Sequence, residues 1–345
     1  MYPRLVGLGI DAVAYARTGY VQQKPYDFRG VHVLPLASIR SPNLETIAHT
    51  CMAIFHCARH GAKLMHLHAI GPAIWTPLAK RLGMKVIVTH HGFDYRRQKW
   101  GNNAKAMLKR GEAMAIKHAD GLICISSEIL ENVTSRSPAG LVAKIPNGVE
   151  RPTSIPSDEE LKRWGLRSGG YLLITARFVA EKGIPDLIRA WDASGLKGTC
   201  ELVVAGGEDH PSKLGDEIRG LAAEAGATMT GIVTGNVLNT LYAHARGFVL
   251  PSYHEGLPIS LLEAMSWNLP CVASSIRANL EVGLDGDSYF TAGRIDDLSE
   301  RMKALVAGPA RVDHSLRLKP FDWDAIASDT ADFYGKVVGK VARAA

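Results

Sequence analysis

Short apolar runs alternate with longer amphipathic segments along almost the whole chain, and this alternation constrains the fold more than any other feature. Residues 43–60 show the helical pattern, with apolar side chains at Leu44, Ile47, Cys51 and Phe55. Strands that alternate with helices predict parallel sheets covered by helices on both faces, which is an α/β fold. In the first half we expect strands at 10–16, 30–36, 64–68, 85–90 and 121–126, and helices at 43–60, 73–82 and 104–117.

A turn-rich segment at 145–157 separates this series from a second one. It contains the sequence Pro-Asn-Gly at 146–148, which is typical of a turn. A chain of 345 residues also suits two cores better than one. We therefore expect Rossmann-like domains at 1–148 and 149–320, with a helix in 321–345 that packs back toward the first domain. In the second series we expect strands at 171–176, 201–205, 247–251 and 270–274, and helices at 184–191, 214–224, 237–245, 259–267, 298–305 and 323–341.

The composition argues against several classes of protein. No apolar run approaches the roughly 20 residues that a membrane-spanning helix needs, and the first residues do not form a signal-peptide pattern. The five cysteines are scattered, which favours free thiols in a reducing cytoplasm. The thirteen histidines have no ligand spacing to cysteine, and no HExxH motif occurs, so we expect no metal site.

Positive charge is concentrated in the first half. Residues 1–150 carry 19 Lys and Arg against 9 Asp and Glu, a net charge of +10, whereas the remainder carries 21 against 25, a net charge of −4. A basic half fits an anionic partner such as a membrane surface or a lipid phosphate. A well-solvated surface explains the charge almost as well. Because no recognition motif accompanies it, nucleic acid is the weakest candidate partner.

Two carboxylates of the second half are placed to meet a ligand. Glu255 lies in the loop after the expected strand 247–251, and Glu263 lies eight residues later in a helix that Pro258 opens. Loops beyond the carboxyl ends of parallel strands bind ligands in open α/β sheets. Gly256 lets the backbone approach such a ligand closely. The carboxylates could accept hydrogen bonds from hydroxyl groups such as those of a sugar, and the helix N-terminus could hold a phosphate.

Two cations follow the expected strand 171–176. Arg177 comes directly after the strand, and Lys182 with Gly183 opens the next helix. A guanidinium group binds phosphate oxygens bidentately and an ammonium group adds a point charge, so the pair suits a diphosphate. Each residue alone could be an ordinary surface residue. Their spacing within one strand-to-helix turn favours a binding site.

Together, the cation pair and the carboxylate pair resemble the retaining glycosyltransferases of family 4. The sequence His-Glu-Gly-Leu-Pro at 254–258, followed by Glu-Ala-Met at 263–265, carries most of the resemblance. The segment 91–101 is similar to bacterial polysaccharide enzymes. That family has the GT-B fold, in which two Rossmann-like domains face each other across a cleft. The resemblance covers nearly the whole chain, with weaker matches at 89–92, 145–149, 204–208 and 230–231.

The resemblance implies transfer of a sugar, with retention, from a nucleotide-sugar donor to a saccharide or polyprenyl-diphosphate-linked acceptor of the bacterial cell envelope. The first domain would face the acceptor and the second would bind the donor. No metal cofactor is implied, because protein cations neutralise the leaving diphosphate. The implied catalytic residues are Glu255 and His91, and the implied donor-binding residues are Arg177, Lys182, Glu263, Gly206, Gly207, Gly231, Gly256 and Leu257.

A basic cluster follows His91. Arg96, Arg97 and Lys99 stand beside Trp100, a residue type common at interfaces. We expect this cluster to form an acceptor or membrane face, with the protein cytoplasmic and peripheral at the inner face of the membrane. A solvated loop is the alternative.

The other histidines near this segment are interpreted as packing residues. Of the adjacent pair His90 and His91, the second precedes Gly92 and is the better site candidate. His66 and His68 lie in the expected strand 64–68, where we expect core or edge positions.

The chain departs from the family pattern at two places. Relatives open with a strand and a Gly-rich loop before the helix that ends near Leu5, whereas Met1 lies inside this helix. The first domain is therefore expected to lack its first strand, or the start codon to be misassigned. Arg277 lies where many relatives carry a Gly pair. Two alternatives stay open. A GT-B sugar-nucleotide epimerase could use the same sheets, but the spacing of Glu255 and Glu263 favours transfer. The missing strand supports a degenerate subunit that binds sugar nucleotide or a partner transferase without catalysis.

Overall fold

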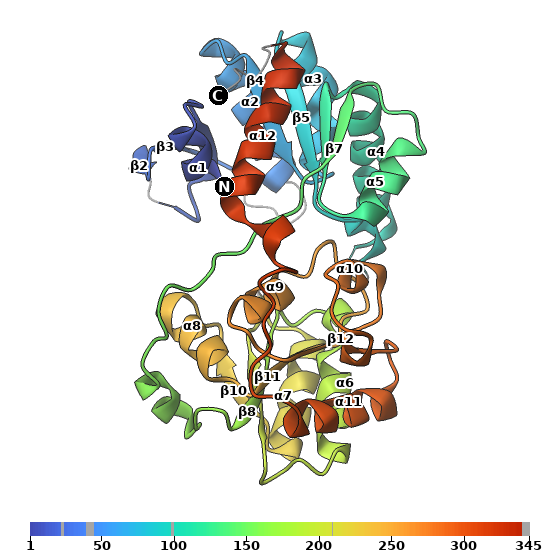
Figure 1. The fold of residues 1–345 in the computed structure, drawn as a ribbon. Helices are drawn as coiled ribbons and strands as arrows, with labels where there is room; N and C mark the ends of the chain where they lie inside the picture. Colours follow the sequence, from blue (N-terminus) through green and yellow to red (C-terminus); the bar gives the residue numbers. More distant parts are fainter. Residues whose placement is uncertain (22–23, 39–44, 98–99, 209, 340–345) are drawn as a thin grey trace. The chain divides into compact units, whose positions relative to one another are not determined.

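The computed structural model describes residues 1–21, 24–38, 45–97, 100–208 and 210–339, which form two units. Unit 1 comprises Met1–Asn147 together with the segment that begins at Trp323, and unit 2 comprises Gly148–Asp322. Each unit is built around parallel strands covered by helices (Figure 1).

Two sheets form the framework of unit 1. One is parallel, with the strand order β4-β5-β6-β7, and the other is mixed, with the order β1-β3-β2. β5 is buried from its second residue onward. Neighbouring strands pair with both of its edges, and helices cover both of its faces. The elements are α1 (Tyr2–Gly7), β1 (Val13–Arg17), β2 (Tyr26–Phe28), β3 (Val31–Leu36), α2 (Glu45–Arg59), β4 (Leu64–His68), η1 (Pro72–Trp75), α3 (Thr76–Arg81), β5 (Lys85–His90), η2 (Asp94–Arg96), α4 (Asn102–His118), β6 (Gly121–Cys124), α5 (Ser127–Thr134), β7 (Leu141–Lys144) and α12 (Trp323–Val338).

The helix α12 is an integral part of unit 1 although it comes last in the sequence. It lies beside α1 and against β5 (Figure 1). Ile326, Phe333 and Val337 of this helix share one core cluster with Leu5 of α1 and Ile87 of β5. Full burial of each such side chain stabilises a fold by roughly 1.5–3 kcal/mol. The core of unit 1 is therefore completed by the C-terminal helix.

A six-stranded parallel sheet forms unit 2. Its strand order is β10-β9-β8-β11-β12-β13. Counted from the first strand of the unit, this is 3-2-1-4-5-6, the order of the Rossmann sheet. The elements are η3 (Glu159–Trp164), β8 (Tyr171–Thr175), η4 (Ala180–Lys182), α6 (Ile184–Ala193), β9 (Glu201–Ala205), α7 (Lys213–Ala225), β10 (Thr228–Gly231), α8 (Gly235–His244), β11 (Gly247–Leu250), α9 (Ile259–Ser266), β12 (Cys271–Ser274), α10 (Arg277–Leu280), η5 (Gly286–Ser288), β13 (Tyr289–Phe290), α11 (Ile295–Ala307) and η6 (Lys319–Phe321).

The predicted α/β fold with parallel Rossmann-like sheets is confirmed, and three expected strands coincide with β4, β5 and β9. The expected helix 73–82 is wrong in form. It starts as the 3-10 helix η1 and becomes α3 only at Thr76, because Pro77 cannot donate a backbone hydrogen bond and so suits the first turn of a new helix. The expected strand 10–16 begins only at Val13.

Some short elements escaped prediction, among them β2, α5, β7, β10, α10 and β13. Each offers too few residues to show a period, and β7 has no buried residue that would mark it as a strand. The single Rossmann-like sheet expected for the first half is also a simplification. Its described strands are divided over two sheets, because β1 and β2 pair with β3 and not with β4.

Within the described ranges, no helix combines the length and the apolar character needed to cross a bilayer. The cysteines are free thiols, as expected, and all except the half-buried Cys51 are buried. Burial raises the pKa of Cys124 to about 12 and that of Cys200 to about 11, so these two thiols stay protonated and unreactive at neutral pH.

Candidate active site

The topology of unit 2 brings the two predicted motifs to one edge of its sheet. β8 and β11 pair in parallel, with Leu172 opposite Gly247, so their carboxyl ends lie side by side. These are strands one and four of the sheet order, the switch point at which open α/β sheets bind ligands. Arg177 and Lys182 follow β8, and Glu255 follows β11.

Lys182 and Glu255 form an ion pair at this edge. Lys182 Nζ lies 2.7 Å from Glu255 Oε1, and the side chains are only 19% and 9% exposed. Water and salt therefore screen the pair less than a surface pair. The Ser252 hydroxyl donates to the same carboxylate oxygen at 2.6 Å. An ammonium group has three N–H donors, so Lys182 is held in place while it retains donors for an anion.

Buried polar side chains support the loop that carries Glu255. The Ser274 hydroxyl donates to the carbonyl oxygen of Ser252, and Asn279 Nδ2 donates to the carbonyl oxygen of Ser274 at 2.9 Å. Ser252, Ser274 and Asn279 have no exposed surface. These residues could not be predicted from the sequence, because single serines and asparagines carry no motif. The one available signal was that Ser274 ends an expected strand at the same sheet edge.

Glu263 of α9 is held by Tyr242 of α8. The Tyr242 hydroxyl donates to Glu263 Oε2 at 2.9 Å, and Thr175 Oγ1, at the end of β8, lies 2.5 Å from the same hydroxyl. Burial raises the pKa of Glu263, and the hydrogen bond from Tyr242 opposes the shift only in part. In the described part of the chain, only Oε2 of Glu263 accepts a side-chain hydrogen bond. A contact between Oε1 and a hydroxyl group of a ligand stays a prediction.

Glycines at the ends of β9 and β10 allow close backbone contact. Gly206 has a φ of +146°, and a Cβ there would lie 1.8 Å from the carbonyl oxygen of Ala176. Its N–H donates to the carbonyl oxygen of Gly231, which has a φ of +70°, at 2.9 Å. A Cβ on Gly207 would meet only the movable side chain of Ile232, at 2.9 Å. The fold itself requires glycine at 206, and a role of these residues at the donor base stays a prediction.

We expect Gly206→Ala to lower the free energy of unfolding by at least about 1–3 kcal/mol, because alanine would combine backbone strain with a backbone clash. Thermal or urea unfolding measures the loss. The matched control is Gly220→Ala in α7, where no atom lies within 4 Å of the new Cβ. This control should be neutral or stabilising by about 0.5–1 kcal/mol. Equal stability of the two variants would contradict the clash.

The other predicted donor residues lie along the same loops. Leu257 is buried, Gly256 is half-buried, and Arg177 is exposed directly after β8. Their contacts to a donor stay predictions. Among the residues that the structure describes, no three His, Cys, Asp or Glu side chains gather as metal ligands would.

His91 of unit 1 follows the carboxyl end of β5 and is half-buried. Its Nε2 lies 2.9 Å from Nδ1 of His68, and the two rings stack with centroids 5.2 Å apart. Burial lowers the pKa of His91, and the neighbouring His90 acts in the same direction. His91 is therefore a neutral hydrogen-bonding group at neutral pH. The expected core or edge position of His68 is an incomplete description, because its ring is bonded to the predicted site residue.

His90 anchors the loop that carries His91. It is 1% exposed, its Nδ1 accepts from the N–H of Gly92 at 3.2 Å, and its Nε2 donates to Glu112 at 2.9 Å. Arg136 Nη1 lies 2.5 Å from the other oxygen of Glu112. Burial alone would raise the pKa of Glu112, but the hydrogen bonds from His90 and Arg136 outweigh it and lower the pKa. The carboxylate therefore stays charged and fixes the loop.

The predicted acceptor or membrane face carries less surplus charge than its sequence indicates. Arg96 forms an ion pair with Glu128 at 2.6 Å, and Arg97 forms one at 3.3 Å with the carboxylate three residues before it. Trp100 is half-buried, and Lys99 lies outside the described residues. The role of this face stays a prediction.

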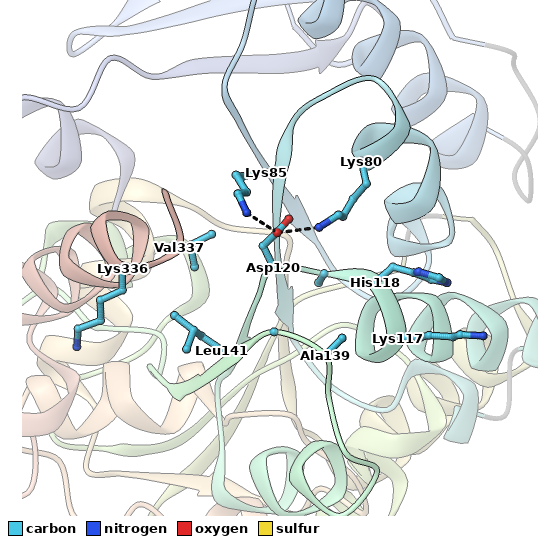
Figure 2. Close-up of a pocket in the computed structure, with 11 residues that line it drawn as sticks. Lys80, Lys85, Lys117, His118, Asp120, Ala139, Leu141, Lys336 and Val337 are labelled. Atoms are coloured by element: carbon cyan, nitrogen blue, oxygen red, sulfur yellow. Dashed lines mark hydrogen bonds and ion pairs between the residues drawn. The ribbon is translucent and has the colours of Figure 1, made fainter. Parts of the chain in front are cut away.

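Unit 1 has a hollow of about 560 Å³ near the amino ends of β5, β6 and β7. These strand ends lie at the edge of the sheet opposite to the carboxyl end of β5, which His91 follows. Figure 2 shows Lys80 and Lys85 reaching Asp120, at 2.7 and 3.0 Å. Lys80, Lys117 and Lys336 lie in the last turns of α3, α4 and α12, where the helix dipole favours cations. The lysines of this hollow thus have structural partners, in Asp120 or in the ends of helices.

Parallel sheets in both units and charged loops at the switch point of unit 2 define the GT-B class of fold. Among solved structures, sucrose-phosphate synthase from Thermosynechococcus elongatus is similar with a TM-score of 0.81 at 20% identity, covering 98% of this chain and 91% of that chain. Residues 2–151 match "Glycosyltransferase Family 4", and residues 169–307 match "Glycosyl transferases group 1". The chain belongs to glycosyltransferase family 4.

Curated relatives have different stated activities. The alpha-maltose-1-phosphate synthase of Mycobacterium tuberculosis is 29% identical over 255 residues, which is 66% of this chain and 65% of that protein. The lipopolysaccharide 1,6-galactosyltransferase of Salmonella typhimurium is 28% identical over 215 residues, 59% of this chain and 57% of that protein. The chain thus spans about two thirds or less of the length of these relatives.

Proposed function

We propose that this protein transfers a sugar, with retention of anomeric configuration, from a nucleotide-sugar donor to a saccharide or lipid-linked acceptor. The observation that carries the proposal is the Lys182–Glu255 ion pair at the switch point of a Rossmann sheet. A fixed cation and a carboxylate at this position would suit a diphosphate and its sugar, which supports the proposal.

The chemistry assigns a task to each group. In transfer, the bond between the anomeric carbon and the diphosphate oxygen breaks, and its electron pair leaves with the diphosphate. Lys182 and Arg177 would stabilise this negative charge without a metal ion. An acceptor hydroxyl then forms the new bond on the same face of the sugar and loses its proton to the leaving phosphate. Glu255 would bind the sugar and stabilise its developing positive charge.

The remaining roles follow the same logic. Glu263 would accept hydrogen bonds from the ribose hydroxyls, which suits a partly desolvated carboxylate that Tyr242 holds by one oxygen only. His91, which is neutral and half-buried, would contact the reacting sugar as a hydrogen-bonding group. The saccharide or lipid-linked acceptor is proposed because relatives include a lipopolysaccharide 1,6-galactosyltransferase and a galactosyltransferase acting on a diphosphoundecaprenol-linked sugar.

A panel of UDP-, GDP-, ADP- and dTDP-linked sugars tests the proposal. We expect at least one donor to raise the melting temperature, and to be transferred or slowly hydrolysed with release of the nucleoside diphosphate in the presence of EDTA. NMR of the product then gives the anomeric configuration. Activity that EDTA abolishes and Mg²⁺ restores would overturn the metal-independent mechanism. If a nucleotide-sugar binds but is not transferred to a single acceptor in a panel of saccharides and polyprenyl diphosphates, the non-catalytic alternative is favoured.

A further inference from the structure

A series of hydrogen bonds runs through unit 1 and ends at His91. Nδ1 of His68 lies 2.9 Å from Nε2 of His91, and Nε2 of His68 is bonded to the Tyr2 hydroxyl. On the same side of β4, Nδ1 of His66 lies 2.5 Å from the Tyr334 hydroxyl and 3.3 Å from that of Tyr2. α1, β4, β5 and α12 therefore meet in one polar network beside the predicted site residue.

The members of the network are uncharged. Burial, with the neighbouring His91, lowers the pKa of His68 to about 4, and burial lowers that of His66 well below its usual value. Burial also raises the pKa of Tyr2 and of Tyr334 far above neutrality, so both phenols keep their protons. A neutral imidazole has one nitrogen that donates and one that accepts. Since both nitrogens of His68 are bonded, one must donate and the other must accept.

The tyrosine fixes which nitrogen accepts. The oxygen of a phenol is a weak acceptor, because its lone pair is delocalised into the ring, whereas the bare nitrogen of an imidazole is a strong one. Of the two directions open to the Tyr2–His68 bond, donation from the Tyr2 O–H to Nε2 of His68 is therefore the favoured one. Tyr334 donates to Nδ1 of His66 in the same way, and Nε2–H of His66 donates to the Thr89 hydroxyl at 2.6 Å. With Nε2 of His68 accepting, its proton resides on Nδ1 and points at His91.

We propose that His68 is a positioning residue that holds His91 in the tautomer with its proton on Nδ1. Nε2 of His91 accepts from His68, so the nitrogen that His91 has left for a substrate is a hydrogen-bond donor. This group would suit a sugar hydroxyl or a leaving oxygen, both of which accept hydrogen bonds. The role of this N–H group in catalysis rests on the proposed function. The inference about the tautomer rests on the hydrogen bonds alone.

NMR of the full-length protein labelled with ¹⁵N-histidine tests the tautomer directly. Long-range ¹H–¹⁵N correlations distinguish a proton on Nδ1 from one on Nε2, and loss of one signal set in His91→Phe assigns the residue. We expect the wild-type His91 to carry its proton on Nδ1. A proton on Nε2 overturns the inference, and His91→Phe, which assigns the signals, is the one variant that this measurement needs.

A matched pair of variants separates positioning from packing. His68→Phe keeps a ring in place but removes the donor to His91, so His91 should revert toward Nε2–H, the form that free histidine prefers, and turnover should fall about 2- to 12-fold, as for loss of one hydrogen bond. The control His56→Phe removes a half-buried histidine ring of α2 in the same unit, which is bonded to Tyr15 at 3.0 Å and lies outside the network. It should leave both the tautomer and the turnover unchanged.

Equal loss of turnover in the two variants, or an unchanged His91 tautomer in His68→Phe, overturns the positioning role. If the wild type transfers no sugar from any nucleotide-sugar, the proposed function fails, while the tautomer measurement still decides this inference.

Discussion

Replacement of Lys182 by methionine is expected to weaken donor binding about 10- to 150-fold, measured as the dissociation constant by calorimetry. The ammonium group is fixed by Glu255 at 2.7 Å and is mostly shielded from solvent. A charge-assisted hydrogen bond to a phosphate oxygen in such a place is worth roughly 1.5–3 kcal/mol, which gives this range. Methionine keeps most of the length of the side chain and removes the charge together with the N–H donors. Glu263→Ala should weaken binding similarly through loss of the ribose contact.

Two controls separate binding from folding. Lys303→Met removes the lysine of an exposed ion pair with Glu300 on α11 and should change neither affinity nor stability measurably. Lys182→Met leaves the carboxylate of Glu255 buried without its cation, which destabilises unit 2. Adding Glu255→Gln should restore stability but not donor affinity. Unchanged affinity in Lys182→Met, or full recovery of affinity in the double variant, would contradict the assignment of Lys182 to the donor site.

The second large effect is expected for His91→Ala, which should lower turnover roughly 100-fold with little change in the affinity for the donor. Removal of one hydrogen-bond donor that acts in the transition state costs about 10²–10³-fold in kcat, and we expect a neutral side chain at the low end. Steady-state kinetics with the donor identified in the panel give kcat and KM separately. His118→Ala, at the opposite edge of the same unit, is the matched control. Loss confined to KM would show that His91 serves binding alone.

The sequence predicts the fold well where elements are long and periodic. The strands β4, β5 and β9 could be predicted from runs of apolar residues, and the helix α12 could be predicted from an apolar stripe. The short α5 and β7 could not be predicted, because eight and four residues hold little periodic information. The division of the first-half strands over two sheets could not be predicted either. It depends on which strands pair, and the pairing is set by contacts between segments far apart in the sequence.

The candidate site could likewise be predicted only in part. The motif residues Lys182 and Glu255 could be named from local pattern, and the strand order of a Rossmann sheet explains why they meet although 73 residues separate them. The residues that hold them could not be named. Ser274 and Tyr242 act through single hydrogen bonds to other elements. For His68 the sequence predicts only a core or edge position, because a strand pattern indicates burial but not the partner of a side chain.

The position of α12 has a consequence for how the chain folds during its synthesis on the ribosome. Unit 2 is one continuous segment, whereas unit 1 needs side chains from both ends of the chain to close its core. Since domains fold as they emerge during synthesis, we expect unit 2 to reach its native state first. Unit 1 should remain incomplete, with apolar surface on α1 and β5 uncovered, until the segment from Trp323 leaves the exit tunnel. Nascent chains arrested before that residue should therefore bind chaperones through their first half and resist protease only in their second.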